Sequence, residues 1–159
     1  MVNRRDIAAA AATLVLALAA ARAPAQRAPS GPLAAVLVVR DCTQTAGDVA
    51  VSRLDPPTVY LCPTVVRLVR KKDPGAEHFY FVHEFGHIAL QTSDEAAADC
   101  WAAGQLANAP HGERYLRAAI EHFRRRPEQQ SWRYGTPAER AERIRSCAQE
   151  ARPPESRRP

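Results

Sequence analysis

The sequence contains no Cys-x-x-Cys pair, no internal repeat and no apolar run long enough to span a membrane comfortably. The first absence argues against a zinc site built from cysteine thiolates, which such pairs usually supply. The C-terminal third is rich in arginine, but its basic residues are not interleaved with aromatic ones and it carries no nucleic-acid-binding motif. We therefore expect no nucleic-acid partner. The surplus of positive charge indicates either a solvated helix face or a weak contact with anionic polymers of the cell envelope.

Residues 1–25 have the features of a targeting segment. Arg4 and Arg5 form a basic start, an apolar run covers Ile7–Ala21, and Ala23-Pro24-Ala25 resembles a site of signal-peptide cleavage. The adjacent arginines leave both the general and the twin-arginine export routes open. We therefore predict a periplasmic or secreted protein with no transmembrane span after the signal peptide is removed.

The chain from residue 26 to 151 is expected to form one α+β domain, followed by a disordered tail at 152–159. Runs of β-branched and apolar residues at 33–40, 48–54 and 58–62 predict a small antiparallel meander, with its first strand buried. Helical patterns then predict a mainly helical layer packed on this sheet. The expected helices begin at Pro63, at Ala76, after a cap at Thr92 or Ser93, at Gly112, and at Pro137 after a capping box.

Four cysteines remain in the predicted mature chain. An even number in an exported protein predicts two disulfide bonds, for which three pairings are possible. We favour Cys42–Cys62 and Cys100–Cys147, because the expected fold brings the segments of each pair together.

The segment Phe81–Leu90 contains the pattern His-Glu-x-x-His within an apolar helical run. On an α-helix His83 and His87 lie one turn apart on the same face, so both imidazoles can reach one metal ion. Glu84 lies about a third of a turn away, close enough to hold a metal-bound water without ligating the metal. This division of roles is typical of zinc-dependent hydrolysis, in which the carboxylate takes a proton as the water attacks a carbonyl.

Together with the next predicted helix, the motif resembles the two-helix signature of the gluzincin metallopeptidases. His83-Glu84-Phe85-Gly86-His87 is followed by Glu95-Ala96-Ala97-Ala98-Asp99, and the stretch from Glu95 to Ala103 is also similar to small exported bacterial neutral zinc metallopeptidases. The resemblance implies a Zn²⁺ cofactor, with Glu95 as the third ligand and Asp99 steadying a ligating histidine. It covers only residues 79–103. The spacing between His87 and Glu95 is much shorter than in the large gluzincins, which leaves no room for a subdomain between the two helices.

Glu95 nevertheless has two competing roles. Thr92-Ser93-Asp94-Glu95 fits a capping box, in which Glu95 would fold back onto its own helix terminus. Against this, two histidines leave a zinc ion under-coordinated. Glu95 and Asp99 lie four residues apart on one helix face, so an antiparallel helix pair would aim both carboxylates at the histidines. We assign the longer Glu95 to the metal and Asp99 to the free ring N–H of a histidine.

His111 begins the fourth predicted helix, after a loop from which it could reach the cleft and stabilise an oxyanion. We therefore include it with Glu84 among the candidate catalytic residues. His78 and His122 are expected at solvated positions.

The resulting hypothesis is an exported zinc-dependent hydrolase that acts on a peptide or protein substrate. Its main alternative is a non-catalytic envelope protein that keeps the zinc site for stability or for partner binding. A basic envelope-binding module in which the histidines are incidental is a third hypothesis.

Overall fold

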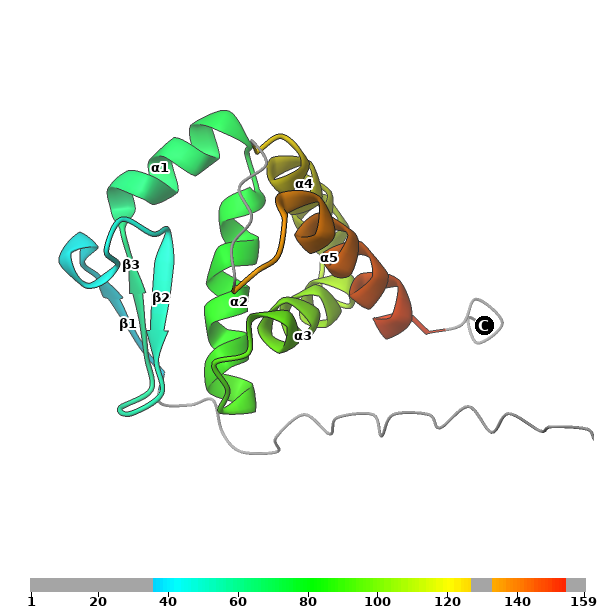
Figure 1. Ribbon diagram of the computed structural model, residues 1–159. Coiled ribbons are helices and arrows are strands. Elements are labelled where there is room, and N and C mark those ends of the chain that lie inside the picture. Colours follow the sequence, from blue (N-terminus) through cyan, green and yellow to red (C-terminus); the bar gives the residue numbers. More distant parts are fainter. Residues whose placement is uncertain (1–35, 127–132, 154–159) are drawn as a thin grey trace, which may run out of the picture.

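The computed structural model of the chain describes residues 36–126 and 133–153 (Figure 1). The predicted signal peptide at 1–25 and most of the predicted tail at 152–159 lie outside these residues. Within them the fold belongs to the expected α+β class, with a small sheet beside five helices. None of the helices in this part of the chain has the length and apolar character that a membrane span requires.

Three short strands form a mixed sheet, so the predicted antiparallel meander is wrong. The strands β1 (Leu37–Arg40), β2 (Ala50–Arg53) and β3 (Thr58–Leu61) lie in the order β1-β3-β2. β3 pairs antiparallel with β2 and parallel with β1. Because neighbouring parallel strands end at the same edge of a sheet, Cys42 and Cys62 meet there in a disulfide bond.

β1 is exposed, although its apolar sequence predicted a buried strand. Leu37 is 59% and Val38 is 42% exposed. The helices cover the side of the sheet on which β2 lies, and β1 is the strand farthest from them (Figure 1). An apolar run therefore identified the strand correctly but could not tell an edge position from a central one.

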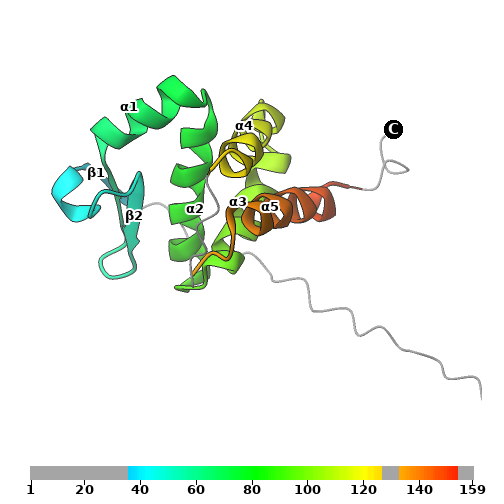
Figure 2. The ribbon, with the colours of Figure 1, turned by 45° about the horizontal axis from the view of Figure 1, so that its top comes forward.

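A short 3₁₀ helix, η1 (Cys42–Gln44), follows β1, and the described chain contains five α-helices. Each α-helix begins within two residues of its predicted start. Figure 2 shows three of them, α3, α4 and α5, gathered on the side of α2 that faces away from the sheet. The main core lies among these four helices and is centred on Phe79, Leu116, Phe123 and Ile144. The helices are α1 (Pro63–Lys72), α2 (Ala76–Leu90), α3 (Glu95–Ala107), α4 (Gly112–Arg124) and α5 (Pro137–Ala151).

α2 and α3 pack closely because residue 86 is a glycine. A Cβ atom at this position would lie 3.0 Å from the carbonyl oxygen of Ala98 and 3.2 Å from its Cα atom. A glycine inside a helix costs about 1 kcal/mol of helix stability, so the close approach of α3 explains its presence here. The disulfide Cys100–Cys147 then joins α3 to α5. The start of α3 is thereby held against the histidine face of α2.

The two disulfides confirm the predicted pairings. Disulfide bonds persist in oxidising compartments and are rare in the reducing cytosol. They therefore indicate that the chain resides in an oxidising, extracellular environment.

Candidate metal centre

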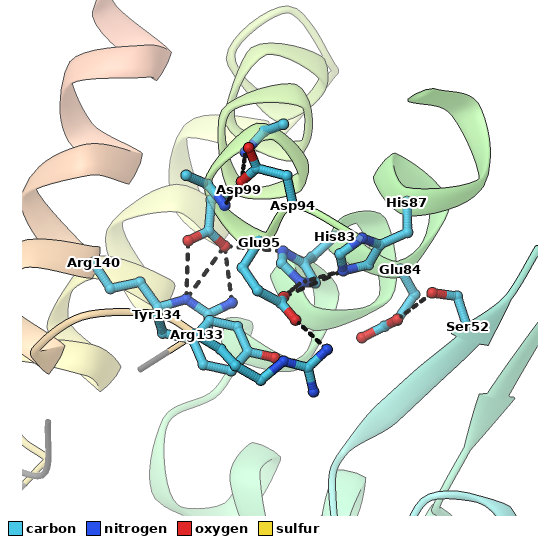
Figure 3. Close-up of polar contacts among 12 residues, drawn as sticks. Ser52, His83, Glu84, His87, Asp94, Glu95, Asp99, Arg133, Tyr134 and Arg140 are labelled. Carbon is cyan, nitrogen blue, oxygen red and sulfur yellow. Dashed lines mark hydrogen bonds and ion pairs between the residues drawn. The ribbon is translucent and has the colours of Figure 1, made fainter. Parts of the chain in front are cut away.

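Three buried donor atoms from α2 and α3 converge at one point (Figure 3). The Nε2 atoms of His83 and His87 lie 3.1 Å apart. The Oε2 atom of Glu95 lies 3.0 Å from the first and 3.2 Å from the second. This group, which we call the donor triangle, could hold a metal ion.

The second nitrogen of each imidazole is already engaged, and this determines the ring tautomers. His87 Nδ1 lies 2.9 Å from the carbonyl oxygen of Thr92, to which it can only donate a hydrogen bond. His83 Nδ1 lies 2.9 Å from Oδ1 of Asp99, an ion-pair contact whose angle falls outside hydrogen-bond geometry. With both Nδ1 atoms protonated, both Nε2 atoms present lone pairs to each other and to the carboxylate of Glu95. Three acceptors that face one point need a positive charge among them.

Glu95 can face the histidines because another residue caps α3. The carboxylate of Asp94 accepts hydrogen bonds from the amides of Ala96 and Ala97 at 2.8 and 3.2 Å. The predicted cap at Thr92 or Ser93 is therefore wrong, and so is the capping-box role of Glu95. The hydroxyl of Thr92 instead accepts a hydrogen bond from the amide of Asp94 and supports the turn between the helices.

Asp99 is fully buried and links His83 to Arg140 of α5 (Figure 3). It also contacts Arg143 of the same helix. Arg140 donates to both oxygens of Asp99 at 2.8 to 3.2 Å, and Arg143 donates to Oδ2 at 3.0 Å. Burial acts to raise the pKa of Asp99, but the contact with His83 and the charge of Arg140 lower it below its usual value. Asp99 is therefore an anion at neutral pH that can orient His83, the role that the sequence predicted for it.

The electrostatics of the donor triangle favour an ionised glutamate. Burial acts to raise the pKa of Glu95, but hydrogen bonds and charges from His83 and His87 lower it well below the usual range. The pKa of His83 is raised above its usual value. Burial lowers this pKa, but the carboxylates of Asp99 and Glu95 raise it by more. The group therefore attracts positive charge.

Glu84 lies beside the donor triangle and is not part of it. Its Oε2 atom accepts a hydrogen bond of 2.7 Å from the hydroxyl of Ser52, which lies on β2. The side chain is buried, yet it lines both neighbouring pockets. Glu84 thus lies next to the histidines with its carboxylate held by the sheet, and its role as a general base stays a prediction.

Two pockets meet beside Glu84 and Tyr134, which line both of them. The first, which we call the Tyr80 pocket, has a volume of about 170 Å³ and reaches Tyr80 and Arg126. The second, the Ser52 pocket, has a volume of about 140 Å³ and reaches Ser52 on β2. The candidate site is therefore open to ligands on both sides of Glu84.

Arg133 and Tyr134 complete the site from the segment before α5, and the sequence analysis missed both. Arg133 Nη2 lies 2.9 Å from Oε1 of Glu95. The ring of Tyr134 lies against the guanidinium of Arg140, 4.2 Å from its carbon. Burial and the charge of Glu95 raise the pKa of Tyr134, so its hydroxyl is protonated at neutral pH and can donate a hydrogen bond. The residues lie in a polar loop without periodicity, so no pattern pointed to them.

His111, a predicted catalytic residue, is not brought to this site. It caps the start of α4 and is exposed. Glu95 begins α3, whereas His111 follows the other end of that helix, whose 13 residues span roughly 20 Å at 1.5 Å per residue. Neither pocket beside Glu84 includes it. The structure therefore offers Tyr134 in its place as a donor near the donor triangle.

His122 is buried, so the prediction of a solvated position is wrong. Its Nδ1 atom lies 2.5 Å from Oδ2 of Asp73, and its Nε2 atom lies 3.0 Å from the hydroxyl of Tyr80. We call these three residues the His122 cluster. They come from the end of α1, from α2 and from α4, and thus join three helices. His78, in contrast, is exposed as expected.

No family model matches the chain, and searches of the curated proteins and of the solved structures found no match either. The likeness to gluzincins therefore rests on residues 79–103 of this sequence. The function has to be argued from the chemistry of the site itself.

Proposed function

We propose that the protein is an exported zinc-dependent peptidase in which Glu84 acts as the general base. One observation carries this proposal: the carboxylate of Glu84 lies beside the donor triangle and is not one of its donors. A site whose metal serves only stability has four protein ligands and no use for such a residue. The described residues supply three donors from His83, His87 and Glu95, as catalytic zinc sites do.

The donor triangle fits a zinc ion in chemistry and in size. Two imidazole nitrogens and one carboxylate oxygen are a common ligand set of catalytic zinc. A tetrahedral ion with bonds of about 2.0–2.1 Å has ligand atoms about 3.3 Å apart. The three separations of 3.0, 3.1 and 3.2 Å are close to that value. The Nδ1 contacts described above also leave both Nε2 lone pairs available.

Zinc, when bound, would polarise a substrate carbonyl and make a water molecule more acidic. Glu84 lies where it can accept the proton of the attacking water and then pass it to the departing amine. The hydroxyl of Ser52 donates a hydrogen bond to Glu84, which orients the carboxylate. Tyr134 keeps its proton and lines both pockets, so its hydroxyl is the best-placed side-chain donor for the developing oxyanion.

A peptide substrate is supported by the position of β2. This strand forms one edge of the sheet, since within the described residues it pairs only with β3. Residues Ala50, Val51 and Ser52 of β2 line the Ser52 pocket beside Glu84. An extended peptide can add to such an edge through main-chain hydrogen bonds, which would lay its scissile bond along the pockets. A small non-peptide ester could not use these contacts.

The test combines metal analysis with cleavage of a broad peptide library. We expect wild-type protein from the periplasm to contain about one zinc per chain and to cleave peptides, with a loss of both after chelation. The matched variant Glu84→Gln should keep the zinc and lose about two to four orders of magnitude in rate. Wild-type protein that binds zinc and cleaves nothing would instead support the non-catalytic alternative. Loss of zinc from Glu84→Gln would mean that Glu84 is a ligand.

A further inference from the structure

The C-terminal ends of α1 and α4 meet and bring together a dense group of positive charges (Figure 1). Asp73, the residue that caps α1, contacts both His122 of the last turn of α4 and Arg125. Every cation of the group is exposed. The group, which we call the basic end, consists of Lys71, Lys72, Arg124, Arg125 and Arg126.

Carboxylates neutralise only part of the basic end. Arg124 pairs with Glu121 at 3.3 Å, and Arg125 pairs with Asp73. Lys71, Lys72 and Arg126 form no ion pair with a carboxylate of the described residues. Lys72 ends α1 and Arg126 follows the end of α4, yet the charges of both contribute to lowering the pKa of His122, so both lie near it.

Helix electrostatics explain some of these charges but not their concentration. A cation in the last turn of a helix is stabilised by the helix dipole, typically by about 0.3–1 kcal/mol. Two such ends placed side by side, however, bring like charges together, and this repulsion opposes folding. An anionic partner would relieve the repulsion. The arrangement therefore favours binding of negative charge at this end of the molecule.

The basic end continues into the candidate active site. Arg126 belongs to it and also lines the Tyr80 pocket, together with His83 and Glu84. We propose that the basic end binds an acidic segment of the polypeptide substrate, whose neighbouring residues then enter the Tyr80 pocket. The entry of the substrate into the Tyr80 pocket rests on the proposed peptidase function, whereas binding of the acidic segment at the basic end requires no turnover.

A polypeptide fits better here than an anionic lipid surface. The charged group adjoins a pocket that leads to Glu84 and to β2, whose outer edge pairs with no other strand of the described residues, and both suit an extended chain. The exposed apolar residue of α1 is Leu68, at 62% exposure. Helices that lie in a membrane interface bury a broad apolar face, which a single leucine does not provide.

Binding can be measured on the full mature chain carrying Glu84→Gln, so that no probe is consumed. The probe is a fluorescein-labelled peptide with four consecutive glutamates, and its control carries glutamines at the same positions. We expect the glutamate peptide to bind, with an affinity that falls as salt is added, and the glutamine peptide to bind at least about fivefold more weakly. Adding Lys72→Gln and Arg126→Gln should weaken binding of the glutamate peptide by about fivefold or more.

The matched control removes the same net charge elsewhere. Arg40→Gln with Arg117→Gln, two exposed arginines outside the basic end, should change the affinity by less than about twofold. Equal effects of the two double variants, or equal binding of the two peptides, would overturn the proposal. So would binding to vesicles containing phosphatidylserine without binding to the glutamate peptide. If the glutamate peptide binds as expected but wild-type protein cleaves no peptide, the docking surface stands and the proposed peptidase function fails.

Discussion

Two buried histidine clusters lie close together along α2, and they differ in how their ring nitrogens are satisfied. In the His122 cluster each nitrogen has a complementary partner, the carboxylate of Asp73 on one side and the hydroxyl of Tyr80 on the other. In the donor triangle the Nε2 atoms of His83 and His87 face each other and a third acceptor. The first cluster is complete as a protein structure, whereas the second could hold a metal ion.

The difference shows why burial of a histidine is a poor indicator of metal binding. His83 and His122 are both nearly inaccessible to solvent, at 1% and 5% exposure. What separates them is the count of donors and acceptors around each ring. In the His122 cluster the polar groups join α1, α2 and α4, so they serve the fold. In the donor triangle three acceptor atoms face one another, as they would around a metal ion.

The largest expected contrast is in metal retention. His87→Ala should abolish binding of zinc at near-stoichiometric concentrations, because only two donors of the triangle remain. His122→Ala should retain about one zinc per chain as long as the protein is folded. Metal content after dialysis, measured by elemental analysis beside circular dichroism, tests both. Retention of zinc by folded His87→Ala would show that the metal, if any, lies elsewhere.

Asp73→Asn tests the other half of the comparison. This change removes a charged partner of His122 and should lower the free energy of unfolding by about 1.5–3 kcal/mol at neutral pH, with zinc affinity unchanged. Although burial opposes it, contacts with His122 and Arg125 hold the pKa of Asp73 below its usual value. The ionised carboxylate therefore contributes its full stabilisation above about pH 3.9, the pKa of an aspartate in an unfolded chain. This contribution is lost as the pH falls through the pKa of Asp73 in the folded protein.

Urea unfolding of wild type and Asp73→Asn across a pH series gives the measurement. The stability difference between the two proteins should shrink as the solution becomes acidic. A difference that stays constant down to strongly acidic pH would contradict the assigned charge of Asp73.

The sequence predicted those parts of the site that depend on short-range geometry. His83, Glu84 and His87 share a helix, and the short turn after it leaves few ways to place Glu95 and Asp99. The sequence also predicted the capping box at the start of α5, and the structure confirms it. Such features follow from the fixed periodicity of a helix and from the chemistry of its ends.

Apart from the cap of α3, which is Asp94 instead of Thr92 or Ser93, the missed features depend on contacts between distant parts of the chain. Arg140 is 41 residues from its partner Asp99, and His122 is 49 residues from Asp73. No local pattern encodes such pairs, and arginine or histidine beside other charges looks like a solvated helix face. The order of the strands was wrong for a related reason, because the hydrophobic pattern identifies strands but does not determine which of them are neighbours.

Asp99→Asn should weaken zinc binding by about 10–100-fold, the usual cost of losing a partner of a ligating histidine. Asparagine keeps the volume of the buried site but removes the charge that holds His83, Arg140 and Arg143. Competition with a chelator of known affinity measures the effect. Asp73→Asn is the matched control, being the same substitution in the His122 cluster. If both variants weaken zinc binding equally, the two clusters are not independent.

The smallest expected effect is that of Tyr80→Phe. Burial raises the pKa of Tyr80, so its hydroxyl is protonated and donates to Nε2 of His122. Its loss leaves a buried acceptor unpaired, which can cost up to about 3 kcal/mol. However, Tyr80 also lines a pocket of about 170 Å³, which has room for water molecules to replace the hydroxyl. We therefore expect a loss of only about 1 kcal/mol in the free energy of unfolding, measured in urea, and no change in zinc affinity. A loss near 3 kcal/mol would show that water does not reach His122, and a change in zinc affinity would show that the two clusters are coupled through α2.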